Sequence, residues 1–177
     1  NDVGNAIRVN VPQSYRAGLE LMANWKFASK WALSANTTFS QNKIKNFTET
    51  IVNYDGDANQ INSLSKTDIS FSPNLIVGGQ LSYNPTKNVE LALMTKYVSK
   101  QFMDNTSDDN RSLDAFFVND IRASYSIKPK LVKELTFSLL VNNIFNHLYE
   151  SNGYTYSYIY DKQVTTENFY YPQAGTN

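Results

Sequence analysis

The sequence predicts an all-β fold, a segment of an antiparallel up-and-down transmembrane β-barrel. Two observations indicate this class. Six stretches of the chain alternate apolar with polar or small residues, which is the period-two pattern of a strand with one apolar face. Very short and very long connections take turns between these stretches, as they do in outer-membrane barrels with short periplasmic turns and long extracellular loops.

The first two strands are predicted from alternation on either side of a short break. In residues 15–27 the odd-numbered positions are apolar, including Leu19 and Leu21, while the even-numbered ones are mostly polar or small, including Glu20. The same alternation restarts at Trp31 and runs to residue 40. Such a short break fits a tight hairpin turn.

Two further hairpins follow the same plan. Each has a proline in its short connection, Pro85 in one and Pro129 in the other, and proline suits a turn because it cannot donate a ladder hydrogen bond. The four strands are residues 75–83 with 89–97 and residues 117–127 with 135–142.

The long connections are predicted to lie at the extracellular end, opposite the tight turns. They are rich in Asn, Asp, Ser, Thr and Tyr, and they exceed the usual limit of about 12 to 15 residues for a loop in a compact soluble domain. We expect the apolar rows to face lipid, because Arg or Lys at mid-membrane costs about 2 to 4 kcal/mol, and the polar rows to line a lumen. The long connections are residues 42–73, 99–115 and 146–177.

Aromatic residues flank the predicted apolar band at both edges. Trp25, Trp31 and Tyr83 lie beside tight turns, whereas Phe39 and Phe117 lie one strand length away. Aromatic rows of this kind form girdles at the two interfaces of a membrane. The alternative is that aromatic residues merely favour strands wherever these occur.

Composition excludes several classes of protein. Sixteen basic and 16 acidic residues give a formal net charge of zero, so the chain lacks the excess of positive charge that is typical of nucleic-acid-binding proteins. The absence of cysteine excludes disulfides, thiolate nucleophiles and cysteine-ligated metal. Mean hydropathy is −0.44 and no apolar run approaches 18 residues, which excludes helical spans but not a barrel, since only alternate residues of a strand meet lipid.

Six strands are too few to close a barrel in the outer membrane, where the known range starts at eight. An open sheet edge in hydrocarbon would leave backbone groups unpaired at several kcal/mol each. The chain also begins and ends in loop-like sequence, residues 1–14 and 170–177. We therefore expect it to be a piece of a larger barrel.

One stretch near the end of the chain resembles a family signature. Residues 140–149, Leu-Val-Asn-Asn-Ile-Phe-Asn-His-Leu-Tyr, are similar to the N-L-F-D/N-x-x-Y signature near the C-terminus of TonB-dependent outer-membrane receptors, with Ile in the Leu position. Residues 15–21, 71–74, 96–106 and 171–177 resemble the same family. The signature residues are Asn142, Asn143, Ile144, Phe145, Asn146 and Tyr149.

The resemblance implies a place in the whole receptor and an activity. Residues 1–177 would be the C-terminal part of a 22-stranded barrel, its sixteenth to twenty-first strands, with the final strand, the earlier strands and the N-terminal plug domain outside this chain. Receptors of this family are multi-pass proteins of the bacterial outer membrane. They take up a scarce nutrient, such as a ferric siderophore, haem, cobalamin or an oligosaccharide, with energy from the TonB complex.

Candidate ligand-binding residues lie in the long connections. Tyr154, Tyr156, Tyr158 and Tyr160 place phenols on one outer loop, and aromatic platforms suit sugars, flat chelates and porphyrins. The alternative is a strand that extends above the membrane, because tyrosine favours strands. We also single out Arg111, which lies among several aspartates of another extracellular loop, as a candidate ligand-binding residue.

No catalytic residue, metal site or cofactor is expected. The sole histidine, His147, could be a haem or metal ligand, but its place in the signature favours a structural or exposed role. A Gly-x-Ser-x-Gly motif is absent, and an enzyme is disfavoured. Two alternatives to a TonB-dependent receptor remain: a passive porin-type channel, which would lack a plug domain, and a soluble β-rich binding module, which would not need detergent.

Overall fold

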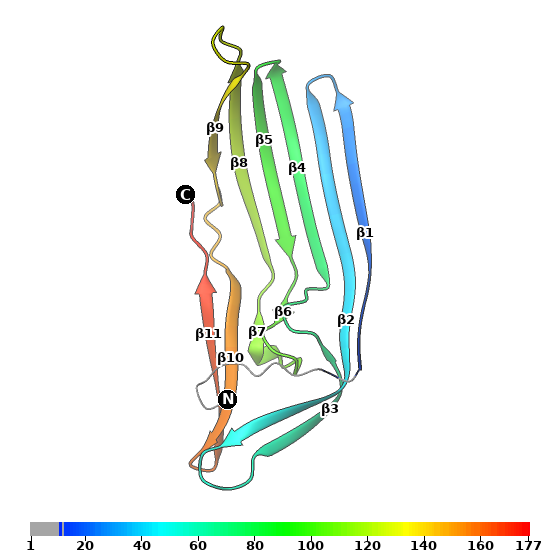
Figure 1. Ribbon diagram of the computed structural model, residues 1–177, viewed down its shortest axis with the longest axis vertical. Coiled ribbons are helices and arrows are strands. Elements are labelled where there is room, and N and C mark those ends of the chain that lie inside the picture. The colour runs from blue at the N-terminus through cyan, green and yellow to red at the C-terminus, as the bar shows by residue number, and fades with distance from the viewer. Residues whose placement is uncertain (1–10, 12) are drawn as a thin grey trace.

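Strands dominate the computed structural model, which describes residue 11 and residues 13–177. The elements run from β1 to β11, and the helical structure within the described residues is one 3-10 turn, η1, at Asp109–Arg111. Six long strands lie side by side in a curled sheet with the shape of half a barrel (Figure 1). The predicted all-β barrel segment is confirmed.

The six long strands follow one another in the sheet in chain order, and each pairs antiparallel with the next. This is up-and-down topology, as the alternation of short and long connections predicts. Their bounds are Gln13–Ala28 for β1, Trp31–Asn53 for β2, Leu75–Thr86 for β4, Val89–Val98 for β5, Phe116–Ile127 for β8 and Leu135–Val141 for β9.

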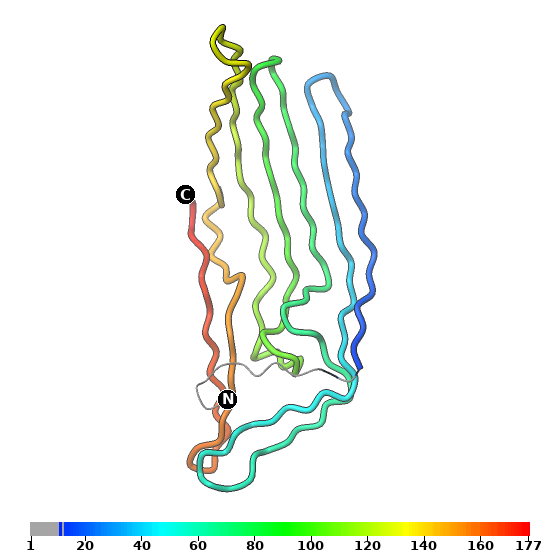
Figure 2. The backbone as a smooth tube through the Cα atoms, viewed as in Figure 1, coloured from blue at the N-terminus to red at the C-terminus, as the bar shows by residue number. Residues whose placement is uncertain are grey.

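The tight turns lie at one end of the sheet and the long connections at the other (Figure 2). Only two residues separate β1 from β2 and two separate β4 from β5. Pro85 lies just before the second of these turns, within an irregularity between Tyr83 and Thr86 where the ladder register shifts. This position agrees with the missing N–H of proline, which excludes it from a regular ladder.

The long connections are more ordered than the sequence predicts. β2 continues to Asn53 and pairs with β3, Gln60–Asp68, and β10, Glu150–Tyr160, pairs with β11, Gln163–Pro172. Two-residue strands β6, Gln101–Phe102, and β7, Ser112–Leu113, pair in the remaining connection. The loops predicted over the outer part of β2, over β3 and over β11, including residues 170–172, were therefore wrong, whereas β10 agrees with the strand that was the alternative for residues 154–160. Both faces of these hairpins are largely polar, so they lack the apolar alternation from which the other strands were predicted.

The tips of the two outer hairpins meet. Val52 and Asn53 of β2 pair in parallel with Tyr158 and Ile159 of β10. The carboxylate of Asp55 accepts hydrogen bonds from the backbone N–H groups of Asp161 at 2.9 Å and Lys162 at 2.8 Å. Segments separated by more than 100 residues in the sequence therefore form one outer end of the molecule (Figure 1).

The predicted apolar rows are exposed on one face of the sheet. Leu21 is 51% exposed, Phe137 57% and Leu139 67%. An apolar surface of this extent is not found on an ordinary monomer in water, whereas it fits lipid. The other exposed large apolar side chains of this face include Leu19, Trp25, Leu33, Phe39, Leu91, Leu93, Phe117, Ile121 and Leu135.

The buried core is small and lies near the outer end of the sheet. Val98, Phe116 and Val118 are buried on the face opposite the exposed rows, with Ile76 and Tyr149 packed against them. Tyr149 stacks on Phe116 with ring centroids 4.4 Å apart. No helix in the described part of the chain is long and apolar enough to cross a membrane.

Candidate functional site

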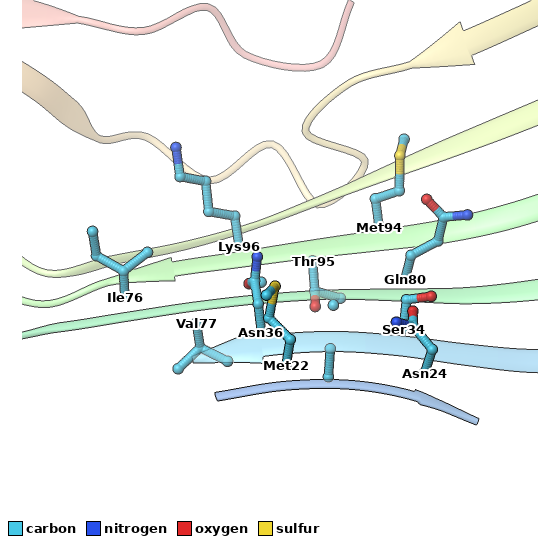
Figure 3. Close-up of a pocket in the computed structure, with 13 residues that line it drawn as sticks. Met22, Asn24, Ser34, Asn36, Ile76, Val77, Gln80, Met94, Thr95 and Lys96 are labelled. Carbon is cyan, nitrogen blue, oxygen red and sulfur yellow. The ribbon is translucent and has the colours of Figure 1, made fainter. Parts of the chain in front are cut away.

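The concave face of the sheet holds a broad open cleft of about 470 Å³. Gln80, Met94 and Lys96 project from the sheet on this side, whereas Val77 and Thr95 point to the other side (Figure 3). The lining is mostly amide, hydroxyl and small side chains, with Met22, Ile76 and Met94 as apolar exceptions. This face therefore carries polar side chains, as predicted for a lumen, together with apolar ones.

Two arginines on the concave face have polar partners on neighbouring segments. The Arg122 guanidinium donates to Glu90 at 2.7 Å, from the neighbouring strand. Arg16 donates to Asn42 at 3.2 Å and to the hydroxyl of Ser72 at 3.0 Å. Such partly exposed pairs contribute little to stability, about 0 to 1 kcal/mol each. They orient polar groups toward the lumen while leaving the face hydrated.

The signature residues form a compact turn that joins three parts of the chain. Asn143 is buried, and its backbone N–H donates to the carboxylate of Asp120 on β8 at 2.7 Å. Its side chain donates to the carbonyl oxygens of His147 at 2.9 Å and Ala174 at 3.2 Å, and accepts from the N–H of His147. Its φ of 49° is left-handed, a conformation that asparagine tolerates better than most residues. We call this turn the Asn143 turn.

Asn146 also stabilises the Asn143 turn. It also has a left-handed φ, 51°, and its side chain accepts from the backbone N–H of Thr176 at 3.2 Å. Gly175 lies so close to the Asn146 side-chain oxygen that a Cβ there would collide with it. The hydroxyl of Thr176 donates to the carbonyl oxygen of Asn143 at 2.7 Å. The Asn143 turn therefore holds the segment after β11 against the end of β9.

The remaining signature positions divide between packing and exposure. Asn142 exchanges backbone hydrogen bonds with Asn177, whereas Ile144 donates its N–H to the carbonyl oxygen of Asn119. Phe145 is 73% exposed. His147 lies beside Tyr149 with ring centroids 6.1 Å apart, and within the described residues no cluster of three potential metal ligands forms around it or elsewhere.

Arg111 lies at the centre of an ion-pair cluster at the outer end of the molecule. Its guanidinium donates to Glu49 of β2 at 2.5 Å and to Asp104 at 3.0 Å, and Asp108 lies 3.6 Å away. The residue is only 7% exposed. The cluster fastens the connection between β5 and β8 to the β2–β3 hairpin.

The neighbouring carboxylates offset the effect of burial on the pKa of Arg111. Desolvation by burial lowers its pKa, but hydrogen bonds and charge interactions with Glu49 and Asp104 outweigh that effect, and the net pKa is raised. Its Nε is buried and has no hydrogen-bond partner. Nearby carboxylates already neutralise the charge of the Arg111 guanidinium. Contact between Arg111 and a ligand stays a prediction.

The four predicted tyrosines lie on one face of the β10–β11 hairpin, so the strand extension that was the alternative interpretation is present. The Tyr154 ring stacks on Phe169 of β11 at 4.7 Å, and Tyr156 lies 6.2 Å from the same ring. Tyr156 and Tyr158 are 5.9 Å apart. We call these stacked rings, with Tyr160 at the strand end, the tyrosine ladder.

Glu167 fixes the middle of the tyrosine ladder. Its carboxylate accepts from the hydroxyls of Tyr156 at 2.8 Å and Tyr158 at 3.0 Å. These hydrogen bonds, together with desolvation, raise the pKa of both phenols. Glu167 therefore favours the neutral form of Tyr156 and Tyr158.

The tyrosine ladder and Arg111 do not converge on one pocket. The opposite face of the hairpin packs on the connection that contains Arg111, and a Cβ at Gly153 would meet Met103 and Leu113 of that connection. Asn168 also donates to the carbonyl oxygen of Asn110 at 2.8 Å. Ligand contact by Tyr154, Tyr156, Tyr158 and Tyr160 stays a prediction.

Sequence reasoning missed the partners that hold these residues. Glu49 and Glu167 lie in segments that were predicted to be loops, and Asp120 was assigned only to the polar row of a strand. Tyrosine at every second position of residues 154–160 was the available signal for the first strand of this hairpin.

A family model identifies the chain. The model of the TonB-dependent receptor-like β-barrel matches residues 1–144, well over half of the sequence. The chain belongs to this family. The TonB-dependent receptor barrel is a fold of the bacterial outer membrane, which agrees with the exposed apolar rows. No curated protein sequence matches the chain.

Solved structures of siderophore receptors share the fold. The siderophore receptor PiuA from Acinetobacter baumannii superposes with a TM-score of 0.65, and the ferric-catecholate import receptor Fiu from E. coli K12 with 0.60. The ferric yersiniabactin uptake receptor FyuA from Yersinia pestis superposes with 0.57. Each is 16% identical over 92% of this chain. The chain spans only 20% to 22% of the length of these structures.

Proposed function

We propose that this chain forms barrel wall and extracellular rim in an outer-membrane receptor for TonB-energised uptake of a scarce nutrient. The observation that carries the proposal is the division of one sheet into an exposed apolar face and a polar concave face, with ordered hairpins above it. A transport barrel needs this division, because its outer face meets lipid and its lumen must admit a polar ligand.

Residues 1–177 would be the C-terminal part of that barrel. Within the described residues, β1 pairs only with β2 along its length, and β9 has β8 as its strand partner. Open edges in hydrocarbon cost several kcal/mol per unpaired backbone group, so we infer that further strands of the same receptor cover them. A plug domain in the lumen and the TonB complex would be the other protein partners.

A ferric siderophore is the nutrient that we favour over haem, cobalamin or an oligosaccharide. Structures with the same fold include receptors named for siderophore, ferric catecholate and ferric yersiniabactin. The tyrosine ladder supports this choice, because stacked aromatic rings suit flat aromatic chelates. Tyr154, Tyr156, Tyr158 and Tyr160 would contact the ligand, and Arg111 would contact it or hold the adjoining loop in place.

The test uses the intact receptor in cells that need it for growth on iron. Uptake of iron-loaded siderophores should depend on the TonB partner. The double substitution Tyr154→Ala with Tyr156→Ala should weaken siderophore binding by roughly tenfold, since a stacked aromatic pair contributes about 0.5 to 1.5 kcal/mol beyond its buried area. Ser157→Ala, on the other face of the hairpin, is the matched control and should bind normally.

Two outcomes would count against the proposal. Uptake that continues unchanged without the TonB partner would indicate a passive porin-type channel. Recovery of the intact protein in water without detergent would instead indicate a soluble β-rich binding module. Equal binding by the double variant and the control would remove the tyrosine ladder from the ligand site without affecting the transport proposal.

A further inference from the structure

Three lysines lie on the exterior face of the sheet, just beyond its outer aromatic girdle. β1 and β2 remain paired in one register from Trp25 to Gln13, so the face assigned at Phe39, which is 50% exposed, continues to Lys43 and Lys45. On the next strand, Lys66 of β3 lies directly opposite Lys45. We call Lys43, Lys45 and Lys66 the lysine patch.

Burial of the neighbouring pair confirms which face the patch occupies. Ile44 and Thr67 lie opposite each other, one position along the ladder, and are only 2% and 3% exposed. Adjacent residues of a strand point to opposite faces of the sheet. Lys45 and Lys66 are correspondingly exposed on the face that carries Phe39 and the rest of the apolar row.

The patch has more positive charge than the protein neutralises. Lys43 is paired with Asp68 at 2.6 Å, but across residues 13–177 neither Lys45 nor Lys66 has an ion-pair partner. Like charges directly opposite each other destabilise a sheet. A polar group of the same face, the Tyr15 hydroxyl, donates to Gln41 at 2.8 Å. The arrangement suits a polyanion with hydroxyl groups.

The height of the lysine patch relative to the membrane indicates which groups surround it. Lys45 is six residues beyond Phe39 on β2, which is roughly 20 Å along a strand and, at a tilt of about 40°, roughly 15 Å along the membrane normal. Groups at this height stand among lipid headgroups, where basic side chains attract phosphates. We propose that the lysine patch binds the phosphorylated sugar headgroup of an outer-leaflet glycolipid.

This site lies on the outside of the barrel. It rests on placement in the outer membrane and not on the identity of the imported nutrient. The lysines would supply the charge for the phosphates, and Tyr15 and Gln41 would face the sugar hydroxyls. The bound glycolipid would relieve the repulsion between Lys45 and Lys66.

The test measures the lipopolysaccharide that stays bound to the intact receptor after purification in detergent, by native mass spectrometry. Lys45→Gln with Lys66→Gln should lower its affinity roughly 25-fold, because each basic residue near a lipid surface contributes about 1 kcal/mol and about 1.4 kcal/mol is tenfold. The control, Lys26→Gln with Lys30→Gln, removes two lysines at the opposite end of the sheet, one near the end of β1 and one in the turn before β2. It should retain lipopolysaccharide normally, as should Lys45→Arg with Lys66→Arg.

A second arm needs no variant. Delipidated wild-type receptor is offered lipopolysaccharide with and without its phosphates, and only the phosphorylated form should bind tightly. Unchanged retention in the glutamine variant, an equal loss in the Lys26 and Lys30 control, or equal binding of the phosphate-free glycolipid would each overturn the proposal. Siderophore uptake, measured on the same variants, reports separately on the proposed function.

Discussion

At the scale of single residues, asparagine has the largest structural effect in this chain. Asn143 combines a left-handed backbone with hydrogen bonds to two other segments and within its own turn, and few residue types can do both. A Leu or Val at this position would have neither the backbone tolerance nor the amide. This explains why a family signature would contain an asparagine in the middle of an otherwise apolar stretch.

Two substitutions of Asn143 separate the effect of its hydrogen bonds on stability from that of its left-handed backbone. Asn143→Ala should destabilise the intact receptor by about 2 to 4 kcal/mol, since it loses buried hydrogen bonds and strains a left-handed residue. Asn143→Gly relieves the strain and should lose only the hydrogen bonds. Urea unfolding in detergent measures both. The control is Asn24→Ala, at an exposed position on the concave face. Equal stability of all three variants would contradict a stabilising role for the Asn143 turn.

The tyrosine ladder should have an alkaline titration that depends on Glu167. The raised pKa of Tyr156 and Tyr158 means that the fold favours the neutral phenols, so the stabilisation from these hydrogen bonds is complete below the ordinary pKa of about 10 and is lost as pH rises through the raised value. Glu167→Gln should move tyrosinate absorbance toward lower pH. A titration curve identical to that of wild type would show that Glu167 does not influence these phenols.

At the scale of the strand, the decisive property is which face meets lipid. Leu21, Leu91 and Leu139 are exposed at 51%, 41% and 67%, all on the apolar rows. The alternate rows carry hydroxyls, and those of Ser124 and Ser138 lie 3.0 Å apart across two strands. A single register therefore determines the environment of every side chain in a strand, because a shift by one residue would exchange the faces.

Aspartate at lipid-facing positions should prevent assembly. Leu21→Asp, Leu91→Asp or Leu139→Asp each places a carboxylate against acyl chains, at a cost on the order of 2 kcal/mol per site. Ser34→Asp and Ser138→Asp place the same charge in the lumen and should be tolerated. The measurement is outer-membrane abundance of the intact receptor. Similar abundance for both sets would mean that the two faces are wrongly assigned.

At the scale of the whole molecule, the surroundings explain what the sequence could predict. Lipid imposes apolar side chains on every second residue, so the six membrane strands and their turns were predicted within a few residues, except that β2 continues to Asn53, well past its predicted end at residue 40. Above the membrane both faces of a strand meet polar groups, so β3 and β11 have no such pattern and were assigned to loops, and the alternating tyrosines of β10 predicted a strand only as an alternative. The pairing of Arg111 with Glu49, separated by 62 residues, depends on how the hairpins fold over one another. Local spacing contains no information about it.

The contact between the β2 and β10 tips also affects how the receptor is seen from outside the cell. Asp55 binds the turn after β10, so the most distal surface combines two stretches that a linear peptide could never reproduce. An antibody or bacteriocin that recognises this tip would need both hairpins folded. An affinity tag inserted at Gly56 would then hide the native epitope on Asp161 as well as its own site.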